Sequence, residues 1–411
     1  MTAKSAQPDR NAGAQPPAVL GVLGGGQLGM LFAQAAQTLG LRVESFSPEA
    51  SPPVAQAVAQ HHSADYTDAG AVEAFGRRCA AISYEFENVP VSAAEVCERV
   101  SRLRPSSRVL RVCQDRLVEK SFLQKHDLAT PAFAGADSLA GLREAMVEVG
   151  LPAVVKTARG GYDGRGQRVV RRVEDAEYAW AELGGGAGMS CIVEAFVGFD
   201  RELSVVVARS VDGAVEAFGP IHNVHRNHVL DLSVYPAGLP EQTAEAARAL
   251  ARGVAEALDL VGVIAVELFH EPGDVLKVNE LAPRPHNSGH LSIEACAVSQ
   301  FTQQVLAVSG NSVRPFAPHG SSAMVNLMGE LWSDGAPDWS AAQADPNAFV
   351  HLYGKAQARP GRKMGHLTVL GDTPQAAVER AAGLRRQAAP WAFQLASDGG
   401  PDRGIEAAPG G

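Results

Sequence analysis

The chain has 411 residues, of which 46% are hydrophobic and 20% are charged, and its formal net charge is −9. This length exceeds that of one ordinary hydrophobic core, so we expect about two to four domains. The composition is typical of globular proteins and excludes the disordered and membrane-spanning classes. Because 45 acidic residues outnumber 36 basic ones and no basic stretch is long enough to follow a phosphate backbone, nucleic acid is excluded as a partner.

The cysteines and the chain ends bear on the compartment in which the protein works. Five cysteines are scattered without a C-x-x-C spacing, and their odd number cannot close into a complete disulfide framework, which favours a reducing cytoplasm. Residues 1–17 are polar, lack the apolar core of a signal peptide and are expected to form a disordered tail. Residues 397–411, rich in Gly and Pro, are expected to form another. No apolar run approaches a bilayer span, so we expect no membrane association.

The first part of the chain alternates strands and helices. An apolar run at Val19–Leu23 and a glycine cluster precede a helical period over Met30–Leu39 and a second strand over Leu41–Phe46. A third strand over Ala80–Tyr84, followed by another helix, continues the alternation. The pattern predicts a doubly wound, Rossmann-like sheet over residues 18–119.

The rest of the chain is expected to form two further domains. Residues 120–310 combine short strands, glycine-rich turns and a long helix over Glu241–Leu258, with a small mobile α+β lid over about 128–199. Pro315–Pro318 indicates a linker. Residues 311–396 mix short strands with a helix and are expected to form a small C-terminal domain.

A glycine motif follows the first expected strand. Gly24, Gly26 and Gly29 fit G-x-G-x-x-G between a strand and a helix, where small residues let a phosphate or a ribose approach the helix N-terminus. A nicotinamide enzyme would need an acidic residue closing the second strand, but Glu44 leads there into Ser-Phe-Ser-Pro. Taken alone, the motif leaves nucleotide binding and a structural tight turn open.

A lysine and a glycine-rich loop stand together in the expected lid. Lys156 ends a strand before residues 160–167, which include four glycines whose amides can lie over phosphates. The segment is not a P-loop, because no G-K-[ST] follows and a strand rather than a helix comes next. A flexible hairpin with a solvated lysine is the alternative.

Two acidic residues end neighbouring strands. Glu267 and Glu280 flank a turn at Pro272–Asp274, and if His270 pairs with Lys277 these two carboxylates face each other. Carboxylates that oppose each other across a ladder repel unless a cation lies between them, so the spacing predicts a magnesium site. A register shifted by one residue would instead put them on opposite faces.

The loop after the second glutamate is dense in hydrogen-bond donors. Leu281–His290 contains two prolines, which exclude regular ladder bonding, and its donors are suited to binding an anion. His286 and His290 are four residues apart, a spacing that would also fit zinc, as would His222, His225 and His228. The only cysteine nearby, however, is Cys296. A structural polar turn is the remaining alternative.

A basic cluster lies near the C-terminus. Lys355, Arg362 and Lys363 stand beside glycines, and together they suit a phosphomonoester. A solvated basic loop is the alternative when the segment is read alone.

Together these segments resemble one family, the ATP-grasp ligases, and within them the 5-(carboxyamino)imidazole ribonucleotide synthases. The resemblance runs from about Leu20 to about Leu367. Its most specific segments are Gly24–Gly29, Tyr84–Asn88, Gln114–Arg116, Gly161–Gln167, Asn279–His290 and Tyr353–Lys355. It implies an ATP-grasp fold of the α/β and α+β classes, with an N-terminal Rossmann-like (pre-ATP-grasp) domain, a mobile lid, a central domain and a small C-terminal β-rich domain. One departure is Leu306, where the family often carries an arginine.

The resemblance further implies that ATP lies between the lid and the central domain. It assigns ATP binding to Arg116, Lys156, Gly161, Tyr162, Asp163, Gly164, Arg165, Gly166, Gln167, Glu194, Ala195, Phe196, Val197, Glu202, His225, Asn279 and Glu280. Among these, Glu194–Val197 would contact adenine and Glu202 the ribose. Glu267 and Glu280 would bind Mg²⁺, with Mn²⁺ as a substitute.

By the same resemblance, the ribonucleotide substrate lies between the central domain and the N-terminal sheet. It assigns substrate binding to Gln27, Leu28, Glu85, Arg284, His286, Asn287, Ser288, Lys355, Arg362 and Lys363. The catalytic residues that it implies are Arg284, Asn287, Lys156, Tyr162 and Asp163.

The implied reaction is the ATP-dependent carboxylation of 5-aminoimidazole ribonucleotide by bicarbonate, through carboxyphosphate, in purine biosynthesis. A lid would keep water from carboxyphosphate. The resemblance also implies a homodimer and functional coupling to the mutase that uses the product. The rival functions are formylation of glycinamide ribonucleotide by a sibling ATP-grasp enzyme, a nicotinamide-dependent oxidoreductase argued only from the first glycine motif, and a catalytically silent nucleotide-binding module.

Overall fold

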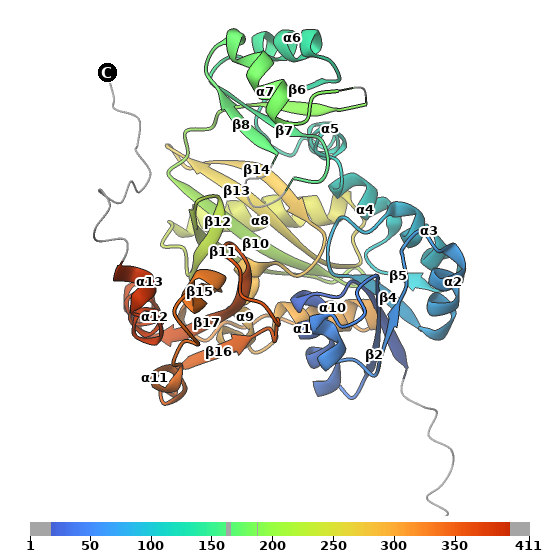
Figure 1. Cartoon of the computed structure of the whole chain (residues 1–411), viewed down its shortest axis with the longest axis vertical. Coiled ribbons are helices and arrows are strands. Elements are labelled where there is room, and N and C mark those ends of the chain that lie inside the picture. The colour runs from blue at the N-terminus through green and yellow to red at the C-terminus, as the bar shows by residue number, and fades with distance from the viewer. Residues whose placement is uncertain (1–17, 162–165, 187, 395–411) are drawn as a thin grey trace, which may run out of the picture.

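The protein is described by a computed structural model over residues 18–161, 166–186 and 188–394. Its strands form three sheets of five, four and eight strands within that part of the chain. Figure 1 shows the four-stranded sheet of the lid above the eight-stranded central sheet, with the N-terminal and C-terminal parts on either side below. No helix in the described ranges is long and apolar enough to cross a membrane.

The N-terminal part is a parallel sheet covered by helices on both faces, as the sequence predicts. The strand order is β3-β2-β1-β4-β5. Its strands are β1 (Val19–Leu23), β2 (Arg42–Ser47), β3 (Gln60–Ser63), β4 (Ala81–Tyr84) and β5 (Arg102–Leu103), and its helices are α1 (Gln27–Thr38), α2 (Ala69–Arg78), α3 (Val91–Val100) and α4 (Ser107–Cys113). Neither β3, whose residues are Gln-His-His-Ser, nor α2 was predicted.

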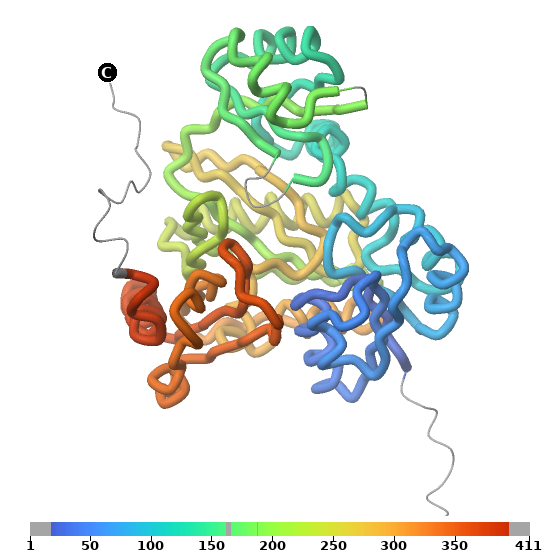
Figure 2. Tube along the Cα trace, viewed as in Figure 1, coloured from blue at the N-terminus to red at the C-terminus, as the bar shows by residue number. Residues whose placement is uncertain are grey.

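The two faces of this sheet have different partners. Helices α2 and α3 pack against one face through Val72, Phe75 and Cys97. Helix α1 covers the other face together with α10 (Gln300–Ser309), which comes from much later in the chain and runs beside the N-terminal part (Figure 2). Leu306 is buried on α10, where an arginine would have to lose its hydration. This packing joins the N-terminal part to the central body.

The lid is a small antiparallel sheet with two helices on one face. Its strand order is β6-β9-β7-β8. Its elements are β6 (Phe133–Ala136), α6 (Leu139–Val149), β7 (Ala153–Thr157), β8 (Gln167–Val170), α7 (Ala176–Glu182) and β9 (Cys191–Ala195). The buried residues Leu142, Met146 and Ala179 of the helices pack on the strands. Short strands are therefore confirmed within the predicted lid.

The central sheet is antiparallel and continues into the C-terminal part. Its strand order is β14-β13-β10-β11-β12-β15-β17-β16. The strands are β10 (Arg201–Arg209), β11 (Val215–Arg226), β12 (Val229–Tyr235), β13 (Gly262–Glu271), β14 (Val275–Ala282), β15 (Ser321–Met328), β16 (Ala348–Leu352) and β17 (Lys363–Gly371). Because β12 pairs directly with β15, the C-terminal strands extend the sheet of the central domain.

Helices and short turns complete the central and C-terminal parts. Helix α8 (Glu241–Ala257) packs on β10, β11 and β13, and α12 (Pro374–Ala388) packs on β15 and β17. The short helices are α9 (Ser292–Ala295), α11 (Ser340–Gln343) and α13 (Trp391–Gln394). The expected linker is a packed segment, since Phe316 is buried and stacks on Phe218 with ring centroids 5.5 Å apart.

Candidate active site

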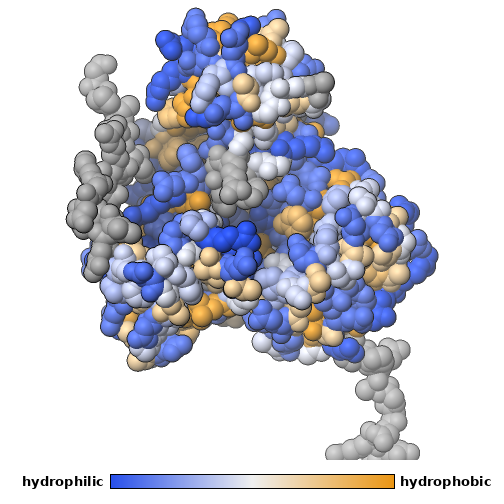
Figure 3. All heavy atoms as spheres, in the orientation of Figure 1, coloured by the Kyte–Doolittle hydropathy of each residue, from blue (hydrophilic) through white to orange (hydrophobic). Residues whose placement is uncertain are grey.

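A cavity of about 980 Å³ opens where the lid, the N-terminal sheet and the central sheet meet. Figure 3 shows the molecule hollowed below the lid, with hydrophilic side chains around the hollow. The predicted site residues that line this cavity are Gln27, Leu28, Glu85, Arg116, Gly161, Gln167, Glu202, His225, Glu267, Asn279, Glu280, Arg284, His286, Asn287 and Lys363. The three parts of the fold thus bring together residues more than 300 positions apart in the sequence.

Some predicted residues lie around this cavity rather than in its wall. The described residues of this kind are Lys156, Gly166, Glu194, Ala195, Phe196, Val197, Ser288, Lys355 and Arg362. Four predicted residues of the glycine-rich loop, Tyr162, Asp163, Gly164 and Arg165, lie outside the described residues.

The first glycine motif accommodates a carboxylate of the protein itself. Helix α1 begins at Gln27, and the backbone N–H groups of Gly26 and Gly29 donate to the two oxygens of Glu85, the second at 2.7 Å. Gly24 has φ +135°, and a Cβ there would lie 2.1 Å from Cγ of Glu85. A dinucleotide phosphate would meet this carboxylate at the helix N-terminus, which contradicts the nicotinamide alternative.

The two glutamates of the central sheet face each other across β13 and β14. Glu267 pairs with Glu280, as predicted, but His270 pairs with Leu276 rather than with Lys277. The register shifts between these two points: Leu268 lies opposite Val278, although its neighbour Glu267 lies opposite Glu280. Asn279 is therefore an extra residue of β14 and forms a β-bulge. The facing pair was therefore predicted correctly from a hairpin register that was wrong at its start.

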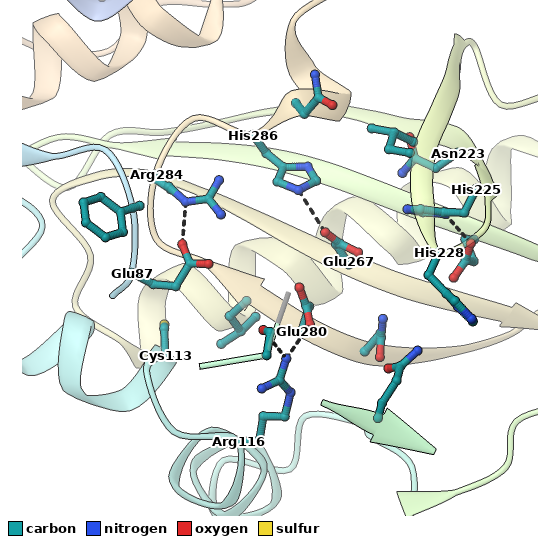
Figure 4. A pocket seen from close by; sticks show the side chains of 18 of the residues that line it. Glu87, Cys113, Arg116, Asn223, His225, His228, Glu267, Glu280, Arg284 and His286 are labelled. Carbon is teal, nitrogen blue, oxygen red and sulfur yellow. Dashed lines mark hydrogen bonds and ion pairs between the residues drawn. The ribbon is translucent and has the colours of Figure 1, made fainter. Parts of the chain in front are cut away.

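The environments of the two carboxylates differ (Figure 4). His286 lies with Nε2 3.0 Å from Oε1 of Glu267, and Arg116 lies with Nη2 3.8 Å from Oε2 of Glu280. Burial opposes ionisation of Glu267, but His286 and the more distant His225 outweigh it and lower the pKa of this carboxyl to about 2. Burial, together with the charge of Glu267, raises the pKa of Glu280 above its usual value. A cation between them would favour ionisation of both carboxylates.

The oxygens around the bulge suit a hard divalent cation. Besides the two carboxylates, Oδ1 of Asn279 is buried and has no hydrogen-bond partner among the described residues. Carboxylate and amide oxygens are the ligands that Mg²⁺ and Mn²⁺ prefer. No group of three or more His, Cys, Asp and Glu side chains in the described ranges is arranged to hold a metal, so the zinc alternative finds no support.

Helix α5 (Arg116–Lys125) holds the bulge from both sides, which the sequence analysis did not predict. Lys120 is fully buried and donates to the carbonyls of Val278 at 3.1 Å and Asn279 at 2.5 Å. Glu119 accepts the backbone N–H of Leu281 at 3.1 Å. Both side chains lie three to four residues after the cavity-lining Arg116, so helical periodicity offered a signal that could have identified them.

Ion pairs organise the lid side of the cavity. Lys156 Nζ lies 2.6 Å from Oε2 of Glu194, and Lys120 Nζ lies 3.6 Å from its other oxygen. Burial would raise the pKa of the Glu194 carboxyl, but the two lysines lower it. Arg116 donates to the carbonyls of Thr157 at 3.3 Å and Gly161 at 3.0 Å, so this arginine links α5 to the start of the glycine-rich loop.

The far side of the cavity carries a second pair of polar side chains. His225 on β11 lies with Nδ1 2.5 Å from Oε2 of Glu202 on β10. Burial lowers the pKa of His225, but the Glu202 carboxylate outweighs this effect and raises it above the usual value. Both residues were predicted from the sequence, but the strand that carries His225 was not.

The substrate-side loop is anchored to two residues that the sequence analysis did not assign. Arg284 pairs with Glu87, with Nε 2.6 Å from Oε2, and Asn287 exchanges two side-chain hydrogen bonds with Asn326, at 3.1 and 2.6 Å. Glu87 belongs to the Tyr84–Asn88 segment, whose acidic residues offered a signal. Asn326 lies inside an apolar strand and offered none.

The basic cluster lies at the edge of the same cavity. Lys355 Nζ donates to the carbonyl of Lys363 at 2.6 Å, and Arg362 donates to the carbonyl of Gln357 at 2.8 Å. Burial, with the neighbouring Arg362 and Lys363 charges, lowers the pKa of Lys355 to about 8. Lys363 itself contributes to the cavity wall.

Comparison with known proteins agrees with this architecture. The model of the ribonucleotide synthetase preATP-grasp domain matches residues 18–114, that of the ATP-grasp domain matches residues 121–301, and that of the phosphoribosylaminoimidazole carboxylase C-terminal domain matches residues 322–380. The fold and the site thus define an ATP-grasp ligase.

Relatives and a solved structure specify the family. The N5-carboxyaminoimidazole ribonucleotide synthase of Brucella melitensis is 38% identical over 356 residues, 86% of this chain and 96% of that protein. A bifunctional purine synthesis protein of Dictyostelium discoideum is 37% identical over 372 residues, 86% of this chain and 37% of that longer protein. The crystal structure of the Aspergillus clavatus N5-carboxyaminoimidazole synthase in complex with ADP and 5-aminoimidazole ribonucleotide has a TM-score of 0.81 at 28% identity, covering 90% of this chain and 99% of that one. The chain belongs to the N5-carboxyaminoimidazole ribonucleotide synthase family.

Proposed function

We propose that the protein carboxylates 5-aminoimidazole ribonucleotide with bicarbonate and ATP, giving N5-carboxyaminoimidazole ribonucleotide, ADP and phosphate in de novo purine biosynthesis. The observation that carries this proposal is the facing pair Glu267 and Glu280, which shares one cavity with the N-terminus of α1 and the basic Lys363. This arrangement provides a place for a nucleotide and a place for a phosphorylated substrate on opposite sides of the reacting atoms. Family membership supports the same reaction.

The ATP side would be formed by the lid, α5 and the ends of β13 and β14. Arg116 and Lys156 would contact the phosphates, and residues 161–167 would cover them. The segment Glu194–Val197 would contact adenine, and Glu202 with His225 would lie at the ribose. Because Lys156 is paired with Glu194 at 2.6 Å, it would keep this partner or exchange it for a phosphate when ATP binds.

Glu267, Glu280 and Asn279 would hold a divalent cation on this side. The orphaned Oδ1 of Asn279 and the repulsion between the facing carboxylates support this assignment. When bound, Mg²⁺ or Mn²⁺ would neutralise charge on the β- and γ-phosphate oxygens during phosphoryl transfer to bicarbonate. The chain's own contribution is to fix the direction of these oxygens through the β-bulge and α5.

The ribonucleotide would lie against the N-terminus of α1. Glu85, held by two backbone amides, presents its remaining lone pairs to the cavity and is suited to accept ribose hydroxyls. Gln27 and Leu28 would line the ribose, and Lys355, Arg362 and Lys363 would bind the phosphate. Arg284 and Asn287 would lie at the reacting carboxyl group, where the guanidinium would stabilise the charge of carboxyphosphate. The amine of the ribonucleotide would attack the carboxyl carbon, and the bond from this carbon to the phosphate oxygen would break to release phosphate.

Family membership also bears on the assembly, the functional partner and the compartment of the protein. We propose that the enzyme is a homodimer, that it is coupled to the mutase that consumes its product, and that it works in the cytoplasm. Five free, buried cysteines support a reducing compartment. Sedimentation equilibrium of the purified chain tests the dimer, and a coupled assay with the mutase tests whether the product is passed on before it loses CO₂.

A coupled assay of ADP release tests the reaction itself. With 5-aminoimidazole ribonucleotide present, ADP release is expected to require bicarbonate and Mg²⁺. Release that requires glycinamide ribonucleotide and formate instead would support the sibling ATP-grasp activity and contradict the proposal. Depleting CO₂ and bicarbonate from the buffer is the control for the co-substrate.

A further inference from the structure

A continuous chain of buried hydrogen bonds runs from the centre of the eight-stranded sheet to the site. Ser233 on β12 donates to Oδ1 of Asn223 at 2.9 Å, and Nδ2 of Asn223 on β11 donates to Oγ of Ser204 at 2.9 Å. Ser204 on β10 donates to Oγ of Ser288 at 2.7 Å, and Ser288 is bonded to Nδ1 of His286 at 2.8 Å. None of these four donors is more than 4% exposed.

The direction of this chain is set at its cavity end by a backbone group. The N–H of Ser288 lies 3.3 Å from Nδ1 of His286, and a backbone N–H can only donate. Nδ1 therefore accepts, so the proton of the neutral imidazole resides on Nε2, which lies 3.0 Å from Oε1 of Glu267. The hydroxyl of Ser288 must then also donate to Nδ1, which leaves its oxygen to accept from Ser204.

Donor and acceptor are then fixed in the remaining hydrogen bonds of the chain. Because the hydroxyl proton of Ser204 points to Ser288, its oxygen must accept, and the only partner in position is the amide nitrogen of Asn223 within the described residues. The carbonyl oxygen of Asn223 then faces Ser233 and accepts its proton. In this one direction each link joins a donor to an acceptor, and reversing any single link would oppose two donors or two acceptors.

We propose that Ser204 and Asn223 are positioning residues of the active site, which act through Ser288 to hold the ring of His286 with Nε2 directed at Glu267. A carboxylate that accepts such a bond through Oε1 keeps Oε2 and its direction fixed for a cation. Neither ring nitrogen of His286 then offers a lone pair, so in this state His286 orients Glu267 and is not the base that takes the substrate's amine proton.

This inference rests on the proposed function for the cation at Glu267, whereas the hydrogen-bond chain and the ring proton are tested without it. The sharpest variant is Ser204→Ala, which leaves Ser288 without its donor and Asn223 without its acceptor. Asn223→Asp is the second variant, because a carboxylate there would draw the proton of Ser204 away from Ser288. Ser322→Ala is the matched control, since Ser322 is a buried serine of the same sheet whose hydroxyl has no partner among the described residues.

Two readouts separate positioning from mere packing. Nitrogen-15 NMR of the histidine rings, with His286 identified by its loss in His286→Asn, is expected to show an unprotonated Nδ1 and a protonated Nε2 in the wild type. In Ser204→Ala Nδ1 should stay unprotonated, but its signal should move toward that of an acceptor nitrogen with one donor fewer, because the Ser288 hydroxyl is no longer held toward it. Calorimetric titration should show weaker binding of Mg·ADP by on the order of 10- to 100-fold, with metal-free ADP unchanged.

The outcomes are distinct. A wild-type His286 with its proton on Nδ1 overturns the proposal, and so does a Ser204→Ala enzyme that melts earlier but keeps wild-type ring signals and Mg·ADP affinity. Ser322→Ala should match the wild type in both readouts, and a shift there of the same size would also count against it. A wild-type protein that binds no Mg·ADP would reject the proposed function, while the ring signals would still decide the direction of the chain.

Discussion

Two sets of carboxylates line the cavity, and they are held in different ways. Glu85 lies at the N-terminus of α1, where backbone amides donate to both of its oxygens. Glu267 and Glu280 lie on facing strands, where side chains supply their partners: His286 for one and Arg116 for the other. The first carboxylate is satisfied by groups that no substitution of a side chain removes. The second pair depends on residues from several elements.

This difference indicates different uses. A carboxylate whose two oxygens accept from main-chain amides is fixed in direction without a side-chain partner and can serve as an acceptor for hydroxyl groups. Two carboxylates that repel each other and are only partly compensated retain capacity for a cation.

Removing the buried lysine under the bulge should have the largest effect. Lys120→Met would remove a donor from the carbonyls of Val278 and Asn279, of which the first keeps the Thr130 hydroxyl, and would leave Glu194 with one cationic neighbour fewer. Loss of one partner from a buried ionic group costs about 3–5 kcal/mol of unfolding free energy. Urea unfolding of the wild type and the variant measures this loss of unfolding free energy. The matched control is Lys125→Met at the exposed end of the same helix, where we expect a change within about 0.5 kcal/mol.

A loss of unfolding free energy below about 1 kcal/mol in Lys120→Met would mean that the β-bulge keeps its conformation without the lysine. In that case α5 would not be the support of the carboxylate pair, and the contrast with Glu85 would be weaker than the geometry indicates.

Neutralising one member of the facing pair should separate activity from stability. Glu280→Gln would remove a ligand of the cation and lower turnover by on the order of 10²-fold, or about 2.7 kcal/mol of transition-state stabilisation. Stability should persist or rise, because repulsion from Glu267 is relieved. Steady-state kinetics and thermal unfolding measure the two effects, with Glu256→Gln on the exposed face of α8 as control. Near-normal turnover would reject the cation assignment.

Adding a methyl group at the first glycine motif should disturb Glu85 alone. Gly24→Ala would strain a backbone at φ +135° and place Cβ 2.1 Å from Glu85, at a cost of about 1–3 kcal/mol, and should raise the KM for the ribonucleotide. Gly40→Ala is the control, because φ there is +74° and a Cβ meets no atom within 4 Å. Strain alone should cost about 1–2 kcal/mol, with kinetics unchanged. Equal kinetics in the two variants would contradict the role of Glu85.

Local patterns were sufficient to predict much of the fold. The strands β1, β2 and β4 and the helix α8 carry apolar runs or helical periods, and each was predicted close to its observed bounds. By contrast β11 and β12, with residues such as His222, Asn223 and Ser233, interleave polar side chains that face the cavity or the buried hydrogen-bond chain. Their hydrophobic signal is weak because function and internal bonding occupy the positions that packing would fill.

Part of the site could also be predicted from local patterns. Local motifs identified Glu267, Glu280 and the loop up to His290, since charges at strand ends and donors between prolines stand out in a sequence. The residues that hold them did not stand out. Lys120 resembles any helical lysine, and Ser204 resembles any buried serine, because their roles arise from contacts with residues 84 to 159 positions away. The β-bulge at Asn279 could likewise not be predicted by counting residues outward from the turn.

The smallest expected effect concerns pH and the basic cluster. Burial and the neighbouring Arg362 and Lys363 lower the pKa of Lys355 from its ordinary value of 10.5 to about 8, so the ammonium loses its proton as pH rises through 8. A phosphate bound there favours the charged form, so binding weakens above this pH. The KM for the ribonucleotide should rise about tenfold per pH unit above 8 at most, equivalent to about 1.4 kcal/mol. The KM for ATP should stay constant over the same range, because Lys355 lies outside the nucleotide side. Lys355→Arg keeps its charge and should show a flat profile, whereas Lys355→Ala should start at a raised KM and show no rise near pH 8. A wild-type KM that stays flat to pH 10 would place the phosphate away from Lys355.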